Sequence, residues 1–196
     1  KNNSMRVSMH PDPYVVLNSN RLGVVERSIN ELKYHVNVLN AMNLDNSHKI
    51  VIHVGGVYGD KKSALKRFKK VLKSLPKVLR ERLVVENDEK SYTVSECLGL
   101  GLPVVLDAFH HELNGDSSLR DLMLLVETTW GMRDGLPIMH YSQQRINGPS
   151  GAHSQTISKK PFLKFYEEVK DFEFDLMLEV KDKEQSTLKV IDWIKK

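Results

Sequence analysis

Apolar positions along this chain follow two alternating spacings, one typical of strands and one typical of helices. Short runs rich in valine, isoleucine and leucine, such as 50–54 and 83–85, have the length and composition of buried strands. Between such runs, apolar residues recur at steps of three and four, which places them on one face of a helix. The first helical stretch carries Val25, Ile29, Leu32, Val36 and Leu39 at this spacing. The pattern therefore predicts units of one strand followed by one helix.

Six such units follow one another without a break in composition. The predicted strands are 5–9, 49–56, 82–88, 102–111, 136–142 and 172–182. The predicted helices are 25–39, 60–75, 93–101, 117–131, 159–171 and 184–196. Repeated βα units form parallel sheets whose crossovers are helices. This spacing alone fits an open doubly wound sheet and a barrel equally well.

A glycine-rich phosphate-binding motif would favour the open sheet, but none follows the first predicted strand. We therefore predict an α/β fold of the TIM (β/α)₈ barrel type, in a single domain that spans residues 1–196. A complete barrel has eight units, so this chain would lack about the first two. The chain begins at Lys1 rather than at methionine, and we expect an N-terminally truncated fragment with two open strand edges.

The composition agrees with one globular domain. Of the 196 residues, 40% are hydrophobic and 28% are charged, and no apolar run approaches the roughly 18 residues that span a membrane. Cys97 is the only cysteine, which excludes a disulfide framework, and its apolar surroundings predict a core residue rather than a nucleophile. The net charge of +4 permits a polyanionic partner without requiring one.

The predicted strands share one feature, which is that each ends on or next to a residue type that binds metals. The chain has only eight histidines, and five of them lie in these positions or in the loop after the fifth strand. The full set is His10, His53, Glu86, Asp107, His110, His140, His153 and Glu179. In a parallel barrel the carboxyl ends of the strands meet on one face, where barrel enzymes have their active sites.

Each of these positions, taken alone, has a more ordinary explanation. A single histidine at a strand end is more often a hydrogen-bonded core residue, and a single carboxylate is more often a helix cap or a salt-bridge partner. Six independent coincidences are harder to accept than one metal cluster. Imidazole and carboxylate without thiolate suit Zn²⁺, Mn²⁺ or Fe²⁺, and bound cations would remove the repulsion among Glu86, Asp107 and Glu179.

Seven short motifs, in their order and at their spacings, resemble the UV damage endonuclease (UvdE) family. They are SMHPD (8–12), IHVGG (52–56), VVEND (84–88), VVLDAFHH (104–111), MHYS (139–142), GAHSQT (151–156) and LMLEVKDKE (176–184). The resemblance runs from about Arg6 to Glu184. Endonuclease IV and the xylose isomerase-like barrels share the order Glu, Asp-x-x-His, His and Glu.

The resemblance implies a barrel that binds about two or three divalent ions, usually manganese, with zinc or magnesium as alternatives. It implies an enzyme that nicks duplex DNA 5′ of pyrimidine photoproducts and leaves 3′-hydroxyl and 5′-phosphate ends. All eight positions would be metal ligands, and Glu86, Glu179, His110 and His140 would be catalytic. Glu86 and Glu179 would be the bridging carboxylates.

The resemblance also implies contacts with UV-damaged double-stranded DNA, with some departures from the family pattern. Tyr14 would stack on bases beside the lesion, whereas Pro13 stands where the family has a polar residue. Ile138 stands where many members carry a carboxylated lysine. We expect further DNA contacts on the same face from Gln143, Gln144, Arg145 and Lys181, and phosphate contacts from Lys61, Lys62, Arg133, Lys159 and Lys160.

Other functions remain open on this reasoning. A sugar isomerase-like or an AP-endonuclease-like metalloenzyme would use the same type of barrel, and a DNA-binding module without catalysis would share the same surface. We expect no membrane association and no obligate protein partner. Because the start of the chain carries no secretory signal, we expect a cytoplasmic location, with binding to the nucleoid when the protein acts on DNA.

Overall fold

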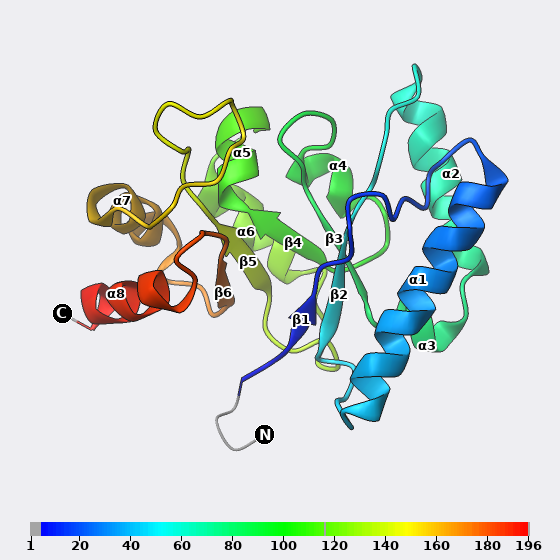
Figure 1. Cartoon of the computed structure of the whole chain (residues 1–196), viewed down its shortest axis with the longest axis horizontal. Coiled ribbons are helices and arrows are strands. Elements are labelled where there is room, and N and C mark those ends of the chain that lie inside the picture. Colours follow the sequence, from blue (N-terminus) through cyan, green and yellow to red (C-terminus); the bar gives the residue numbers. More distant parts are fainter. Residues whose placement is uncertain (1–4, 116, 196) are drawn as a thin grey trace.

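A curved sheet of six parallel strands forms the centre of the molecule (Figure 1). The computed structural model describes residues 5–115 and 117–195. Within them the strands run side by side in chain order, as β1 (Ser8–Met9), β2 (Lys49–His53), β3 (Leu83–Glu86), β4 (Val104–Asp107), β5 (Ile138–Tyr141) and β6 (Asp175–Leu178). Each neighbouring pair is parallel. The sheet is an open segment of a (β/α) barrel, so the predicted fold class is confirmed.

Helices connect the strands and lie on the outer side of the sheet (Figure 1). They are α1 (Leu22–Ala41), α2 (Lys61–Ser74), α3 (Lys77–Arg80), α4 (Val94–Leu98), α5 (Ala108–Asn114), α6 (Leu119–Glu127), α7 (Lys159–Val169) and α8 (Glu184–Ile194). None of the helices in the described ranges is long and apolar enough to cross a lipid bilayer. All six predicted βα units are present; Lys196, at the end of the last predicted helix, lies outside the described residues.

One short helix adds to the sequence interpretation and another corrects it. The predicted helix 60–75 ends before Pro76 as expected, and α3 follows Pro76 as an additional short helix. We predicted a strand over the whole of 102–111, but β4 ends at Asp107 and α5 begins at the next residue. The side chain of Asp107 accepts a hydrogen bond from the backbone N–H of His110 at 2.7 Å and so caps this helix.

Both faces of the sheet carry apolar side chains, as expected where helices cover parallel strands. The outer face packs against the helices in the main core, which includes Ile50, Ile52, Val85, Leu106 and Met139. The inner face carries a smaller apolar cluster made of Val51, Val84, Val105 and Ile138. Two residues further along the same four strands come His53, Glu86, Asp107 and His140. The two-residue period of the strands therefore aims these four side chains into the barrel.

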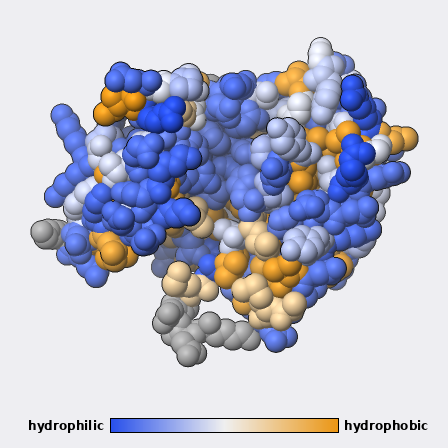
Figure 2. All heavy atoms as spheres, in the orientation of Figure 1, coloured by the Kyte–Doolittle hydropathy of each residue, from blue (hydrophilic) through white to orange (hydrophobic). Residues whose placement is uncertain are grey.

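The sheet is open between its two edge strands, β1 and β6. A cleft of about 590 Å³ lies there, lined partly by Met5 and Met177. Figure 2 shows hydrophobic spheres beside the grey N-terminal atoms in the lower part of the molecule. The side chain of Arg6 crosses between the two edges and donates from Nε to Asp175 at 2.6 Å. The open edges that we predicted are therefore present in the described part of the chain.

A glycine shapes the turn after β2 and brings two loops together. Gly55 has a φ of +104°, and a Cβ atom at this position would lie 2.4 Å from Oδ1 of Asn18. Neither that backbone conformation nor that space accepts a side chain. The Asn18 amide donates to the carbonyl of Gly56 at 2.8 Å, which fixes the β1–α1 loop against the β2–α2 loop at the carboxyl ends of the strands.

Candidate metal centre

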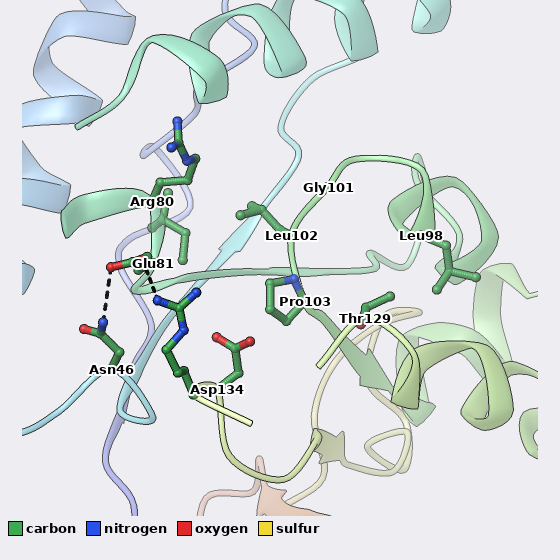
Figure 3. Close-up of a pocket in the computed structure, with 11 residues that line it drawn as sticks. Asn46, Arg80, Glu81, Leu98, Gly101, Leu102, Pro103, Thr129 and Asp134 are labelled. Carbon is green, nitrogen blue, oxygen red and sulfur yellow. Dashed lines mark hydrogen bonds and ion pairs between the residues drawn. The ribbon is translucent and has the colours of Figure 1, made fainter. Parts of the chain in front are cut away.

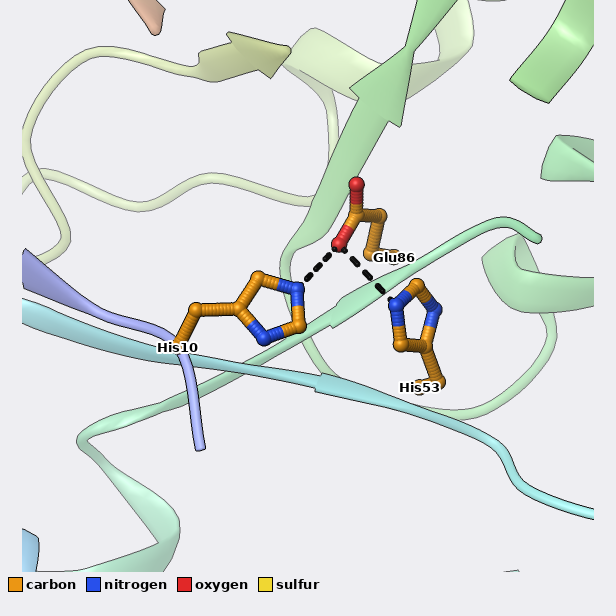
Figure 4. A group of neighbouring side chains, drawn as sticks. All are labelled: His10, His53 and Glu86. Atoms are coloured by element: carbon orange, nitrogen blue, oxygen red, sulfur yellow. Dashed lines mark hydrogen bonds and ion pairs between the residues drawn. The ribbon is translucent and has the colours of Figure 1, made fainter. Parts of the chain in front are cut away.

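Glu86, at the end of β3, lies at the centre of the predicted cluster. Its side chain is fully buried, and its two oxygens face histidines from different strands. Oε2 lies 2.8 Å from Nε2 of His10 and 3.6 Å from Nε2 of His53, as Figure 4 shows. Oε1 lies 2.8 Å from Nδ1 of His140. One carboxylate therefore links the ends of β1, β2, β3 and β5.

The remaining residues of the predicted set extend the cluster across the barrel. Nδ1 of His110 lies 3.7 Å from Oδ2 of Asp107 and 3.8 Å from Oε1 of Glu86. Nδ1 of His140 also lies 3.1 Å from Glu179, which in turn lies 3.6 Å from Nδ1 of His153. All eight predicted residues thus form one continuous network, although they come from positions 10 to 179 of the chain.

Within this network, three groups have ligand atoms close enough together to hold an ion. The groups are His10–His53–Glu86, Glu86–Asp107–His110 and Glu86–His140–Glu179, and within each the ligand atoms lie within 4.8 Å of one another. Glu86 belongs to all three. His153 belongs to none of them and joins the network through Glu179, with its ring 6.0 Å from that of His110. The geometry suits neighbouring ions that share a bridging carboxylate.

The side chains of the cluster do not by themselves keep all of its carboxylates ionised. Burial on its own would raise the pKa of Glu86, but the imidazoles of His140, His10 and His53 hold that pKa well below its ordinary value. Burial, reinforced by the carboxylate of Glu86, raises the pKa of Asp107 to about 7. Glu86 is therefore ionised at neutral pH, whereas Asp107 needs a further positive charge nearby to be fully ionised.

Buried polar atoms without partners test whether this site fits a cation. Among the described residues, Nδ1 of His53, Oδ2 of Asp107 and Nε2 of His140 are buried and have no hydrogen-bond partner. Unpaired buried polar atoms are costly, so few are found in folded proteins. All three belong to residues of the same network, and Oδ2 of Asp107 faces it, 3.7 Å from Nδ1 of His110. In His53 and His140 the unpaired nitrogen is the one that does not face Glu86. The donor set and the unpaired oxygen of Asp107 therefore fit a divalent cation.

Comparison with known proteins places the chain in a family. The family model described as UV-endonuclease UvdE matches residues 1–196, the whole chain. The chain belongs to the UV-endonuclease UvdE family.

Two further comparisons support this membership and one supports the fold. A UV DNA damage endonuclease of Clostridium perfringens is 43% identical over 202 residues, which cover 100% of this chain and 49% of the relative. A crystal structure of SacUVDE matches with a TM-score of 0.92 and 43% identity, covering 99% of this chain and 66% of that one. D-Psicose 3-epimerase from Clostridium cellulolyticum H10 matches with a TM-score of 0.56 and 14% identity, over 89% of this chain and 64% of that chain, and shows the fold alone. The UvdE chain described here spans about half the length of the Clostridium perfringens relative.

The floor of the site in this UvdE protein is apolar. Ile138 is buried in the inner cluster, two residues before His140 on the same face of β5. Its neighbours there are Val51, Val84 and Val105, with Trp130 packed against them. Ile138 therefore places hydrocarbon directly beneath His140 and the other inward residues of the network.

The residues that we predicted to contact DNA differ in exposure and in whether their side chains already have partners within the protein. Tyr14 is 84% exposed in the β1–α1 loop. Gln143 and Gln144 instead build the β5–α7 loop, because Gln143 bonds the backbone of Ser158 and Gln144 bonds that of Pro149 and Gly151. Arg145 and Lys181 are exposed and form no ion pair with the residues that the structure describes. Of the four polar residues, these two cations remain free to bind a phosphate.

Of the additional predicted phosphate contacts, the placement of Arg133 needs correction, and Lys61 is paired within the protein. We placed Arg133 on the face of the strand ends, but it follows α6 and lines a cavity of about 370 Å³ at the amino-terminal ends of the strands. Figure 3 shows other residues of this cavity, among them Glu81, to which Arg133 donates at 3.3 Å. Lys61 lies on the predicted face, but its ammonium group is paired with Glu96 at 2.9 Å.

The sequence analysis overlooked Asn87, which follows Glu86 directly. Its side chain is fully buried and contacts the backbone of Asp107. The motif VVEND contains it, so the signal was a polar residue at the end of an apolar strand.

Proposed function

We propose that the protein to which this chain belongs is a metal-dependent endonuclease that acts on UV-damaged double-stranded DNA. The substrate bond would be the phosphodiester immediately 5′ of a pyrimidine photoproduct, and hydrolysis would leave 3′-hydroxyl and 5′-phosphate ends. The observation that carries this proposal is the network centred on the buried Glu86, in a chain that belongs to the UvdE family.

The residues of the network would hold about two or three divalent ions, with manganese as the proposed metal. His10 and His53, Asp107 and His110, and His140 and Glu179 would each complete a group with Glu86. His153 would assist through Glu179. When bound, such ions supply Lewis acidity that stabilises the charge developing on phosphodiester oxygens.

The burial of the ligands indicates from which side the substrate arrives. Glu86, Asp107, His110 and His140 are buried at the bottom of the site. The side chains of His10, His53, Glu179 and His153 are between 25% and 34% exposed and form its rim. The scissile phosphate would therefore approach the rim, where Glu179 lies beside the reacting group. His140, held between Glu86 and Glu179, would keep the latter in place.

Contacts with the duplex would come from the loops around this rim. The exposed ring of Tyr14, four residues after His10, would stack on bases next to the lesion. Arg145 and Lys181, on the loops after β5 and β6, would bind backbone phosphates without reading the sequence. Gln143 and Gln144 would act by holding the loop that carries Arg145. The protein would act at the nucleoid of the cytoplasm, with no obligate protein partner.

A nicking assay tests this function. Full-length protein, freed of metal, is incubated with supercoiled plasmid that is UV-irradiated, depurinated or untreated, with and without Mn²⁺. We expect nicking of the irradiated plasmid only when Mn²⁺ is present, and loss of nicking in Glu179→Gln. Nicking of depurinated plasmid alone would instead support an AP endonuclease. Binding of irradiated DNA without nicking would contradict the proposed catalysis.

A further inference from the structure

Asn87 makes a paired contact with the next strand at the point where the ladder of backbone hydrogen bonds ends. The side-chain amide donates from Nδ2 to the carbonyl of Asp107 at 3.1 Å. Its Oδ1 accepts from the N–H of Asp107 at 2.8 Å. An amide side chain has the donor and acceptor of a peptide group, so Asn87 pairs with Asp107 as a neighbouring strand would.

The register of the sheet explains why a side-chain amide takes the place of a backbone partner here. The last paired residues of β3 and β4 are Glu86 and Val105, so Asp107 extends beyond the ladder. The chain after Glu86 turns away from β4, and without another contact the end of β4 would have no partner on this side. The Asn87 amide supplies that contact and holds Asp107 at the level of the site.

The backbone carbonyl of Asn87 orients a second residue. It lies 3.0 Å from Nδ1 of His110. A carbonyl can only accept, so in this contact Nδ1 carries the proton and Nε2 keeps a free lone pair. The backbone N–H of His110 is meanwhile bound by Oδ1 of Asp107, which leaves Oδ2 of Asp107 without a partner. Asn87 thus leaves Nε2 of His110 free, and the cap of α5 leaves Oδ2 of Asp107 free, while the Asn87 amide holds the backbone of Asp107 in place.

We propose that Asn87 is a positioning residue that prepares Asp107 and His110 to bind one ion of the centre. The proposal rests on the proposed function, because it assigns a role within the same site. Asn87 makes no hydrogen bond to His10, His53, His140 or Glu179 among those found in the described residues. Its loss therefore weakens the Glu86–Asp107–His110 group selectively.

A second buried asparagine provides a matched control. Asn18 is also fully buried and also bonds a backbone carbonyl on the same face of the barrel, that of Gly56. It makes no hydrogen bond to Asp107 or His110. If Asn87 only fills space and satisfies a buried backbone, Asn18→Ala and Asn87→Ala will have the same consequences for metal binding.

The test measures Mn²⁺ affinity and stoichiometry in the full-length protein, by electron paramagnetic resonance of free Mn²⁺ together with calorimetry. The variants are Asn87→Ala, Asn87→Leu, which keeps most of the volume, Asp107→Asn and Asn18→Ala. Loss of a residue that orients a ligand weakens binding by about 10- to 100-fold. In both Asn87 variants we expect this weakening at one of the Mn²⁺ sites. The affinity of the other sites should stay within about twofold of the wild type. Asn87→Ala combined with Asp107→Asn should bind no worse than Asp107→Asn alone, because both act on the same group.

Two results would overturn the role of Asn87. One is Mn²⁺ binding by both Asn87 variants that stays within about twofold of the wild type while Asp107→Asn is weakened. The other is an equal loss in Asn18→Ala, which would indicate general loosening. Nicking of irradiated plasmid by the same preparations separates this question from the proposed function. A wild type whose Mn²⁺ affinity depends on Asn87 but that does not nick damaged DNA would contradict the function and leave the positioning role standing.

Discussion

Buried charged side chains have different kinds of partner at the two ends of the barrel. At the amino-terminal ends of the strands, Arg6 is paired with Asp175, and the 1% exposed ammonium group of Lys49 is bonded to Asp134 at 2.5 Å and to the carbonyl of Glu81. Arg82, which is also buried there, has no carboxylate partner and is held by neutral acceptors, among them the backbone carbonyls of Leu44 and His48, while its Nε has no partner. At the carboxyl ends, three carboxylates and five imidazoles share one network, and Asp107, His53 and His140 each keep an unpaired buried atom.

This difference distinguishes a structural end from a functional one. The buried cations at the amino-terminal end are held by carboxylates, as Arg6 and Lys49 are, or by backbone carbonyls, as Arg82 is. The other end has lone pairs to offer and too little positive charge to keep Asp107 ionised, since burial raises its pKa to about 7. Between the two ends lies the apolar layer of Val51, Val84, Val105 and Ile138, which separates their electrostatics. Substitutions at the two ends should therefore have different consequences.

The largest effect is expected from Glu86→Gln at the carboxyl end. The change keeps the size of the side chain but removes the charge that all three groups share. We expect nicking of irradiated plasmid to fall by at least about a thousandfold, which corresponds to about 4 kcal/mol of transition-state stabilisation. Initial rates at saturating Mn²⁺ measure it. A fall of less than tenfold, in a variant shown to be folded, would remove Glu86 from the centre of the mechanism.

Lys49→Met at the amino-terminal end should reduce stability rather than metal binding. The change leaves the carboxylate of Asp134 without its cation, but that side chain is 24% exposed and partly solvated. We expect the free energy of unfolding to fall by about 1–3 kcal/mol in urea titrations. Mn²⁺ affinity should be unchanged at a temperature where the variant is folded. A selective loss of Mn²⁺ would show that the two ends are coupled.

A smaller effect is expected when surface cations of the two ends are compared. Arg145→Ala removes an unpaired cation from the carboxyl-end loops, and Arg133→Ala removes a cation that is paired with Glu81 at the opposite end. Arg145→Ala should weaken binding of undamaged and irradiated duplexes alike, and lower the slope of log affinity against log salt by about 1. Arg133→Ala should leave affinity and slope unchanged. Equal slopes for the two variants would place the duplex elsewhere.

The smallest effect concerns His48, a histidine of the amino-terminal end. Its Nδ1 accepts from the N–H of Val7 at 2.8 Å, which requires the neutral ring. Burial lowers the pKa of His48 below 6.5. A folded pKa below the unfolded one means that this contribution is complete above about pH 6.5 and is lost as the pH falls through the lower value.

Urea midpoints between pH 7.5 and 5 measure this contribution. Wild type should lose about 0.5–1 kcal/mol more than His48→Gln over that range, the value of one hydrogen bond. All other histidines are the same in both proteins, so the difference between the two curves isolates the contribution of His48. Identical curves would show that the contact of His48 with Val7 contributes nothing to stability.

The sequence predicted the strands, and which residues at their ends point into the barrel, because both depend on local rules. The two-residue period places His53, Glu86, Asp107 and His140 above the apolar layer wherever the strands are parallel and buried. The start of α5 within 102–111 was missed because Asp107 serves both as a helix cap and as a member of the cluster. The sequence alone does not distinguish an aspartate that caps a helix from one that belongs to such a cluster.

Contacts between distant segments could not be predicted from the sequence. Arg133 was placed on the wrong face; it lies between α6 and β5, in a loop that joins the amino-terminal end of that strand. Gln143 and Gln144 are of a residue type that often contacts DNA. In this structure, however, their side chains bond backbone groups up to 15 residues away in the sequence. Asn87 was overlooked because its partner, the backbone of Asp107, leaves no trace in residue type.

The central claim is that the carboxyl ends of the strands form a metal centre bridged by Glu86. Elemental analysis of purified, folded full-length protein after equilibration with Mn²⁺ and desalting tests it most directly. The account predicts about two or three ions per chain in the wild type. It predicts an unchanged content in Lys49→Met and a loss of most of it in Glu86→Gln. Fewer than about one ion per wild-type chain, or an equal content in Glu86→Gln, would contradict the claim.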